Sequence, residues 1–423
     1  MQPLTGGMYL GFENAIGHPA EFIISYSGLN EHRPSKTAGK RGHCGNEYNL
    51  MQYLNKTGRT VPRYEFSHGM FEMKNCKDVQ FKDGSYPLFD DIDILCAVPV
   101  CSGLSALTTT DDNQKDIKNC NMKFLAEYAV KVIQPKIYIF ENAPGFMSEK
   151  GAELRKYFEE LACNYKYSLT YFKTDTKYHH NCQRRPRTFV MFVKWSDNRQ
   201  YERSPETPYY EDVQLTLKDI LSQIPNDATY QDSLPAPLYE NETYIAYIKE
   251  RYPDDWRNWF EGDVMNKIIA QGMLDDFRKW CETTDNVDRK FADRMIRHID
   301  HIIECKSEGR GWWSAPPKYY KTLSPAVQAR TVYAMIHPWE DRLCSERDML
   351  TLMGMPYDFE MYGDFMSDGV KIGQNVPVRT AEWIANIAVK TLDYINTDRD
   401  SYNDADVHHG ARFYDNTKKK EIY

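Results

Sequence analysis

The sequence predicts an α/β fold, a doubly wound and mostly parallel sheet with a second, smaller domain. Two apolar runs, Ile94–Val98 and Ile137–Phe140, have the length of strands and end at turn residues, as buried strands of a parallel sheet do. Helical apolar patterns over Asn119–Ile133 and Lys150–Leu161 alternate with strand-like runs such as Ser168–Phe172. Because strands and helices alternate along the chain, helices are expected on both faces of one sheet.

Length and composition narrow the class of protein. The chain has 423 residues, too many for one compact core, so two domains are expected. Its hydrophobic content of 41% and mean hydropathy of −0.67 indicate a globular protein. No apolar run is long enough to span a membrane and no signal peptide is visible, so no membrane partner is expected.

Cysteine usage and charge exclude two further classes of protein. The ten cysteines lack the CxxC pairing of a zinc site, so no metal is expected, and their spread fits a reducing cytoplasm. The net charge of −8 argues against a uniformly basic protein that coats DNA. A DNA-binding surface would need its positive charge segregated into a cleft.

Cys101 is the first candidate catalytic residue. It follows the Ile94–Val98 run, so it is expected just past the carboxyl end of a strand, where ligands bind in open α/β sheets. Backbone N–H groups and nearby cations there could lower the pKa of a thiol and yield a nucleophile. A free cysteine is usually a small buried hydrophobic residue, and Cys101 taken alone does not overturn that interpretation.

Two later stretches favour catalysis. Glu141 ends the Ile137–Phe140 run, and Gln183, Arg185 and Arg187 precede the strand-like Thr188–Val193. A thiol, a carboxylate and cations beside strand ends suit attack on a pyrimidine ring. The thiol would add to C6, the acid would protonate N3, and the cations would hold the base carbonyl.

These motifs resemble those of the DNA cytosine-5 methyltransferases. The matching segments, in the order of that family, are Val98–Ser105, Glu141–Ala143, Gln183–Arg187, Arg342–Asp348 and Gly373–Pro377. The resemblance implies a methyltransferase-like Rossmann domain over residues 1–195, a target recognition domain over 196–323, and a segment over 324–423 that returns to the catalytic domain. It implies double-stranded DNA as partner, in the cytoplasm of a prokaryotic or phage-infected cell. The lysine-rich tail ending at Lys420 is expected to be disordered.

The resemblance also assigns roles to residues. Cys101 would attack C6 of an extruded cytosine, Glu141 would protonate N3, and Arg185 and Arg187 would brace the base carbonyl and nearby loops. Other substrate contacts are expected from the following residues: Ser102, Ser105, Gln183 and Arg310. Arg310 belongs to the best loop candidate for DNA contact, Arg310–Trp313. Most tryptophans of the recognition region are expected to pack in its core.

The chain departs from the family where S-adenosylmethionine binds. Aligned on Gly6 and Gly7, Gln2 replaces the aromatic residue of the family's glycine-rich turn and Leu4 replaces a glycine, while the preceding strand with its Asp is absent. The stretch Ser25–Ser27 replaces the acid that binds the cofactor ribose. The third acidic contact is missing near His68, and Gln374 stands where the family has Asn. A misassigned start codon would explain the missing strand but not Leu4 or Ser25–Ser27.

These departures suggest that the base chemistry is kept and the donor changed. The slightly favoured donor is 5,10-methylenetetrahydrofolate, which would give 5-hydroxymethylcytosine. Residues expected at the donor site are Gly6, Gly7, Tyr9, Phe12, Tyr26, Gln374 and Asn375, with Arg33, Lys36, Lys40 and Arg41 as cations for a glutamate tail. The alternatives are a methyltransferase that uses S-adenosylmethionine with an eroded motif, and an inactive DNA-binding relative.

Overall fold

The computed structural model describes residues 1–26, 32–33, 42–72, 74–86, 89–100, 103–104, 112–195, 215–224, 239–312, 316–322, 324–327, 334–397, 411–415 and 420–421. Several predicted site residues lie outside these ranges: Cys101, Ser102, Ser105, Lys36, Lys40 and Arg41. Arg33 lies in a described strand, but its side chain is not described.

A six-stranded sheet forms the centre of the molecule, with the order β14-β13-β7-β9-β6-β5. The bounds are β5 Ile94–Ala97, β6 Ile137–Asn142, β7 Tyr167–Asp175, β9 Pro186–Lys194, β13 Arg412–Asp415 and β14 Lys420–Glu421. β5 pairs parallel with β6 and β13 pairs parallel with β7, whereas β9 runs antiparallel to both of its neighbours. The predicted α/β sheet is confirmed. The expectation of a disordered lysine-rich tail is wrong at Lys420, which lies in β14 and pairs with β13, whereas Lys418 and Lys419 lie outside the described residues.

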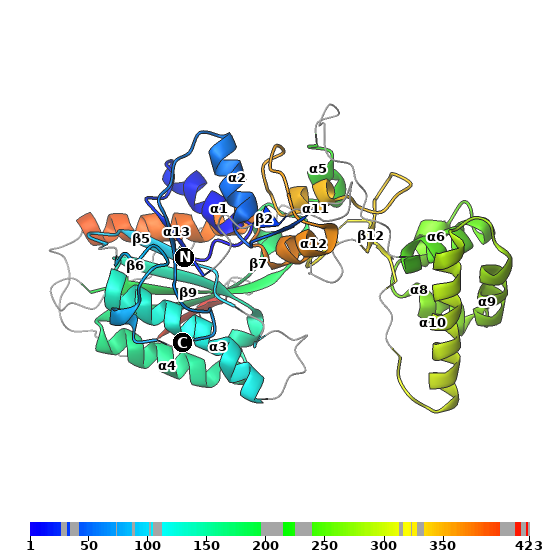
Figure 1. Ribbon diagram of the computed structural model, residues 1–423, viewed down its shortest axis with the longest axis horizontal. Coiled ribbons are helices and arrows are strands. Elements are labelled where there is room, and N and C mark those ends of the chain that lie inside the picture. The colour runs from blue at the N-terminus through cyan, green and yellow to red at the C-terminus, as the bar shows by residue number, and fades with distance from the viewer. Residues whose placement is uncertain are drawn as a thin grey trace.

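Helices cover both faces of this sheet (Figure 1). α1 (Gly7–Ile16) and α13 (Val378–Thr397) pack on one face, and Gly11 lets their backbones approach closely. α3 (Asp112–Tyr128) and α4 (Ala152–Asn164) cover the other face, and α3 continues as a π-helical turn over Ala129–Ile133. The predicted helices are therefore confirmed, and each face of the sheet has its own apolar core.

A third core lies beside the sheet. It joins α2 (Tyr48–Lys56), α5 (Leu217–Leu221) and α11 (Glu346–Leu352), with α12 (Phe365–Gln374) packed against them through Ile372. In this region β8 (Gln183–Arg184) pairs with β11 (Ser324–Pro325). α5 was expected in the recognition domain, but its leucines pack with the elements that surround the catalytic sheet.

Five helices form a separate group at the right of Figure 1. They are α6 (Tyr239–Arg251), α7 (Trp256–Trp259), α8 (Val264–Ala270), α9 (Leu274–Thr283) and α10 (Arg289–Ser307). Trp256 and Trp280 are buried in their shared core, as expected for most tryptophans of this region. A short parallel pair, β10 (Lys318–Tyr319) and β12 (Met335–Ile336), lies between this group and the rest of the chain.

The remaining strands form small separate pairs. β1 (Ile23–Ser25) runs parallel to β4 (Arg63–Glu65), and β2 (His32–Arg33) runs antiparallel to β3 (His43–Cys44). Short 3-10 turns cover Cys76–Asp78, Pro144–Met147, Glu149–Gly151 and Thr176–Tyr178. Among the described residues, no helix is long and apolar enough to cross a membrane.

Candidate functional site

Glu141 lies at the carboxyl end of β6, where the parallel neighbour β5 also ends. Ala97 of β5 is in register with Phe140, so the segment that leads to Cys101 leaves the sheet beside Glu141. Glu141 as a whole is 4% exposed. Burial raises the pKa of Glu141, because a desolvated carboxylate is costly, while the charges of Arg187 and Arg185 act in the opposite direction.

Arg187 is placed beside Glu141 by the register of β9. Thr188 pairs with Asn142 in the antiparallel β6–β9 ladder, so Arg187 stands one residue beyond the end of β6. Its Nε lies 2.5 Å from Oε1 of Glu141, and its side chain is 17% exposed. The predicted acid and one predicted cation therefore form an ion pair at this edge of the sheet.

The loop that contains Cys101 is held at both of its described ends. The N–H of Val100 donates to Oδ1 of Asn121 at 2.9 Å. On the far side, the carbonyl of Leu104 lies so close to Gly145 that a Cβ there would stand 2.1 Å from the oxygen. Gly145 lies two residues beyond the Glu141–Ala143 motif, so Leu104 packs against the turn that follows Glu141.

Asn121 is a buried polar residue at this site that the sequence analysis missed. It is fully buried on α3, next to Met122, among otherwise apolar side chains. The signal in the sequence was a polar residue within a helical apolar stripe. Buried amides need hydrogen-bond partners, and one partner here is the backbone N–H of Val100, at the described end of the loop that contains Cys101.

Gln183 and Arg185 form hydrogen bonds with the backbone of segments that are distant in sequence. Oε1 of Gln183 accepts from the N–H of Val327 at 3.0 Å, and Nη1 of Arg185 donates to the carbonyl of Val327 at 2.5 Å. Nη2 of Arg185 donates to the carbonyls of Gly373 and Asn375, at 2.8 and 2.9 Å. Both side chains are buried, so in this structure they hold loops together from the inside.

The turn at the N-terminus, which leads to Gly6 and Gly7, has an unusual backbone conformation. Gln2 and Leu4 both have positive φ, 48° and 53°, although neither is glycine. Such conformations cost free energy and persist only where surrounding contacts impose them. One contact is the N–H of Gly7, which donates to Oδ1 of Asn375 at 2.9 Å. Gln374, by contrast, is exposed at the end of α12.

Glu47 is a second residue that the sequence analysis missed. It precedes α2, is 2% exposed, and hydrogen-bonds Ser25 at the carboxyl end of β1. Burial raises its pKa to about 8, against the lowering effect of that hydrogen bond. None of the described residues bonds its Oε2. A carboxyl group therefore does stand at the end of β1, supplied by a different segment from the one expected.

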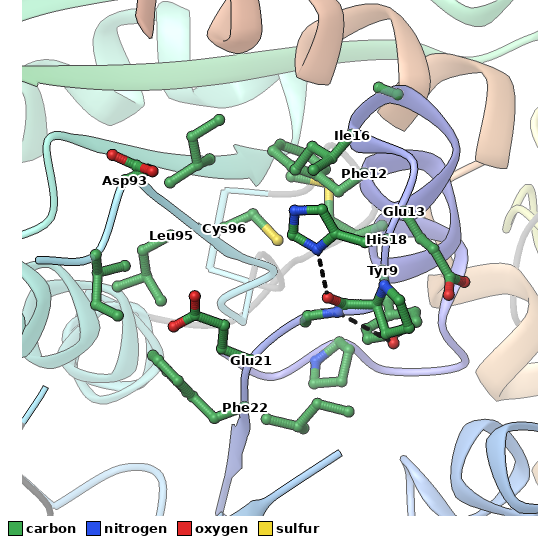
Figure 2. A pocket seen from close by; sticks show the side chains of 18 of the residues that line it. Tyr9, Phe12, Glu13, Ile16, His18, Glu21, Phe22, Asp93, Leu95 and Cys96 are labelled. Atoms are coloured by element: carbon green, nitrogen blue, oxygen red, sulfur yellow. Dashed lines mark hydrogen bonds between the residues drawn. The ribbon is translucent and has the colours of Figure 1, made fainter. Parts of the chain in front are cut away.

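The expected aromatic residues of the donor site lie in two places. Tyr9 and Phe12 of α1 line a cavity between α1, β1 and β5 (Figure 2). Tyr26 instead packs among rings, 4.8 Å from Phe66 and 5.3 Å from His68 between centroids. Among the side chains that the structure describes, no cluster has the composition of a metal site.

Arg310 follows α10 at the edge of the helical group. Its side chain is 52% exposed and forms an ion pair with Glu308. It remains accessible to a partner, although that ion pair would have to be exchanged for a contact with DNA.

Comparisons with known proteins show which family the chain belongs to. Residues 59–390 match the model of the C-5 cytosine-specific DNA methylases. M.MjaORF1200P of Methanocaldococcus jannaschii, assigned as a type II methyltransferase, is 24% identical over 311 residues. The match covers 71% of this chain and 66% of that protein. DNA (cytosine-5)-methyltransferase CMT2 of Arabidopsis thaliana is 19% identical over 385 residues, covering 73% of this chain and 29% of that protein.

The chain thus spans less than two thirds of the length of these relatives. Among solved structures, a protein assigned as a DNA modification methyltransferase and encoded within a prophage (E. coli) has a TM-score of 0.51 and 16% identity. The likeness covers 92% of this chain and 97% of that one, and it establishes a common fold.

Proposed function

Because the chain belongs to the C-5 cytosine-specific DNA methylase family, we propose that it transfers a methyl group to C5 of cytosine in double-stranded DNA. The observation that carries this proposal is the buried carboxyl group of Glu141, paired with Arg187 where β5 and β6 end. A buried acid with a raised pKa, beside the loop of a thiol nucleophile, is suited to protonate a ring nitrogen.

The reaction proceeds by covalent addition. The thiolate of Cys101 forms a bond to C6 while Glu141 gives a proton to N3, and C5 becomes an enamine carbon. C5 would then take a methyl group from the donor, whose sulfonium is left as a neutral thioether. Loss of the C5 proton to a base expels the thiolate of Cys101, and loss of the proton from N3 restores the neutral aromatic ring. The target cytosine must leave the helix first, because both of its faces are stacked within the duplex.

We propose S-adenosylmethionine as the donor, which supplies the methyl group when bound. The described residues fit this cofactor better than the alignment suggested. Glu47 offers an unpaired carboxyl oxygen at the end of β1, and the turn from Gln2 to Gly6 keeps left-handed conformations. A carboxyl group at the end of β1, where the resemblance places the ribose-binding acid, can accept hydrogen bonds from ribose hydroxyls. Glu47 and the turn would hold the cofactor.

The folate donor stays a prediction with less support. Its proposed aromatic residues do not line one cavity, because Tyr26 packs apart from Tyr9 and Phe12. Its proposed cations Lys36, Lys40 and Arg41 lie outside the described residues. The third hypothesis, an inactive DNA-binding relative, is disfavoured by the Glu141–Arg187 pair, since a buried ion pair is costly to keep without a role.

For DNA recognition we propose the helical group α6–α10, with Arg310 at its edge. The group has its own buried core, so its surface can vary without loss of the catalytic sheet. Arg310 would contact a phosphate, which positions a protein on DNA without reading the sequence.

The covalent step can be tested by trapping. A duplex with 5-fluorocytosine blocks release, because fluorine at C5 cannot leave as a proton does. With S-adenosylmethionine present, the protein should form an adduct that survives denaturation. Cys101→Ala should form none, whereas Cys163→Ala, which changes an exposed cysteine on α4, should form as much as the unchanged protein. An adduct with Cys101→Ala would refute the assignment of the nucleophile.

A further inference from the structure

Asn121 of α3 is a fully buried amide to which the proposed reaction gives no role. Met122, Phe124 and Leu125 of the same helix are fully buried and apolar. An amide in such surroundings costs free energy unless its polar atoms find hydrogen-bond partners. The partners of Asn121 therefore indicate what a polar side chain does at this position.

The oxygen of the amide holds the backbone just before Cys101. Oδ1 of Asn121 accepts a hydrogen bond from the N–H of Val100 at 2.9 Å. Pro99 has no N–H, so the N–H of Val100 is the backbone donor closest to Cys101 in the described chain that leads to it. Asn121 thus fixes the chain one residue before the nucleophile, which itself lies outside the described residues.

The nitrogen of the amide faces away from this loop. A backbone N–H can only donate, so the oxygen of Asn121 must face Val100 and Nδ2 must point elsewhere. Burial raises the pKa of the Tyr26 hydroxyl, and Asn121 acts on it in the opposite direction. Nδ2 has no close hydrogen bond with any described residue. Val100 is therefore the firm partner of the amide, and Tyr26 at the end of β1 is its neighbour on the other side.

The next residue of α3 contacts the motif of the acid. Nδ2 of Asn142 lies 3.7 Å from Sδ of Met122, and Oδ1 of Asn142 accepts from the N–H of Ala143 at 2.9 Å. Asn142 directly follows Glu141. Consecutive residues of one helix thus touch the residue before the thiol and the residue after the acid. Because a helix holds its residues at a fixed spacing, α3 relates the two segments to each other.

We propose that Asn121 is a positioning residue for the covalent step, because it fixes the point from which Cys101 approaches C6 relative to Glu141. This inference rests on the proposed methyl transfer, in which thiol and acid act on one ring. Both groups must reach that ring in the same geometry, and a misplacement of about 1 Å can cost about 100-fold in rate. Binding of DNA and of the donor does not need this precision.

Two substitutions separate the oxygen of Asn121 from its shape. Asn121→Leu has nearly the same shape but removes the acceptor, so the partly buried N–H of Val100 loses its partner. Asn121→Asp has nearly the same shape and keeps an oxygen that can accept this N–H. The matched control is Asn164→Leu, which makes the same exchange at an exposed position of α4.

The test measures the full chain in two ways. In Asn121→Leu, amide hydrogen exchange at Val100 should become faster by about tenfold or more. Single-turnover methyl transfer should fall by about 100-fold, while KM for DNA stays within about threefold. Asn121→Asp should keep the protection of Val100 and recover at least about tenfold of the lost rate. Asn164→Leu should change neither exchange at Val100 nor the rate.

Three results would overturn the proposal. One is unchanged exchange at Val100 in Asn121→Leu, and another is an equal loss of rate in the Leu and Asp variants. If Asn121→Leu does not fold, Asn121→Asp decides alone, and faster exchange at Val100 in that folded variant is the third. A lack of 5-methylcytosine with the unchanged protein would instead refute the proposed methyl transfer, while exchange at Val100 would still show whether Asn121 holds the loop.

Discussion

Nε of Arg187 lies 2.5 Å from Oε1 of Glu141, at the point where β6 ends and its antiparallel neighbour β9 begins. The pair is largely buried, so solvent screens its interaction only weakly. Burial raises the pKa of Glu141 and Arg187 lowers it, so the proton affinity of the acid is set by the balance of the two.

Replacing the acid should slow the reaction without unfolding the protein. Glu141→Gln is nearly isosteric but cannot give up a proton in the same way, so single-turnover methyl transfer should fall by about two to four orders of magnitude. Affinity for DNA should change little. Glu149→Gln, an exposed acid on the following turn, is the matched control and should keep full activity. A loss below about tenfold for Glu141→Gln would reduce Glu141 to a structural role.

Removing the cation should change the pH dependence. Glu141 must carry a proton to act, so the rate should fall as pH rises through its pKa. Because Arg187 lowers that pKa, Arg187→Ala should move this limb of the rate profile to higher pH. Arg187→Lys keeps a positive charge and should move it less. A limb that stays in place, or moves to lower pH in Arg187→Ala, would contradict the pairing.

The α/β fold class could be predicted from the sequence because the central strands are short apolar runs bounded by turns. Ile94–Ala97 and Ile137–Asn142 form where apolar runs end at polar residues, and the helices follow the apolar stripes. The strand β13 was not predicted, and the reason is physical. Arg412–Asp415 has only a partly apolar pattern, and it is stabilised as a strand by pairing with β7, a partner far away in sequence.

The site was predictable only in part. Glu141 and Arg187 come together because strand register places them side by side, and motif spacing reflects that register. Glu47 was missed because it reaches the end of β1 from another segment, which only tertiary structure can bring there. Arg185 and Gln183 proved to hold Val327, since a motif gives a residue's place and not the direction of its side chain.

Arg185 should matter for stability as well as for activity. Its guanidinium donates to the carbonyls of Val327, Gly373 and Asn375, and the side chain is 1% exposed. Arg185→Met would leave these buried carbonyls without their donor and should lower the free energy of unfolding by about 3 kcal/mol. Urea denaturation measures this loss. Its exposed neighbour is the control, and Arg184→Met should cost less than about 0.5 kcal/mol. Equal losses for both would refute the bracing role.

Arg310 provides a test of the DNA surface. If it contacts a phosphate, Arg310→Ala should weaken binding similarly for all sequences and reduce the slope of log affinity against log salt by about one. Arg289 on α10, whose side chain is equally exposed and paired with Asp293, is the matched control through Arg289→Ala. A salt slope that is the same in Arg310→Ala and the unchanged protein would remove Arg310 from the interface.

The central claim is methyl transfer to cytosine C5 through Cys101, and the mass of the product nucleosides tests it most directly. Unmodified plasmid DNA is incubated with the protein and either S-adenosylmethionine or 5,10-methylenetetrahydrofolate, then digested to nucleosides and analysed by mass spectrometry. We predict 5-methylcytosine with S-adenosylmethionine, none with Cys101→Ala, and no modified cytosine with the folate. Appearance of 5-hydroxymethylcytosine with the folate alone, or of no modified cytosine with either donor, would contradict the account.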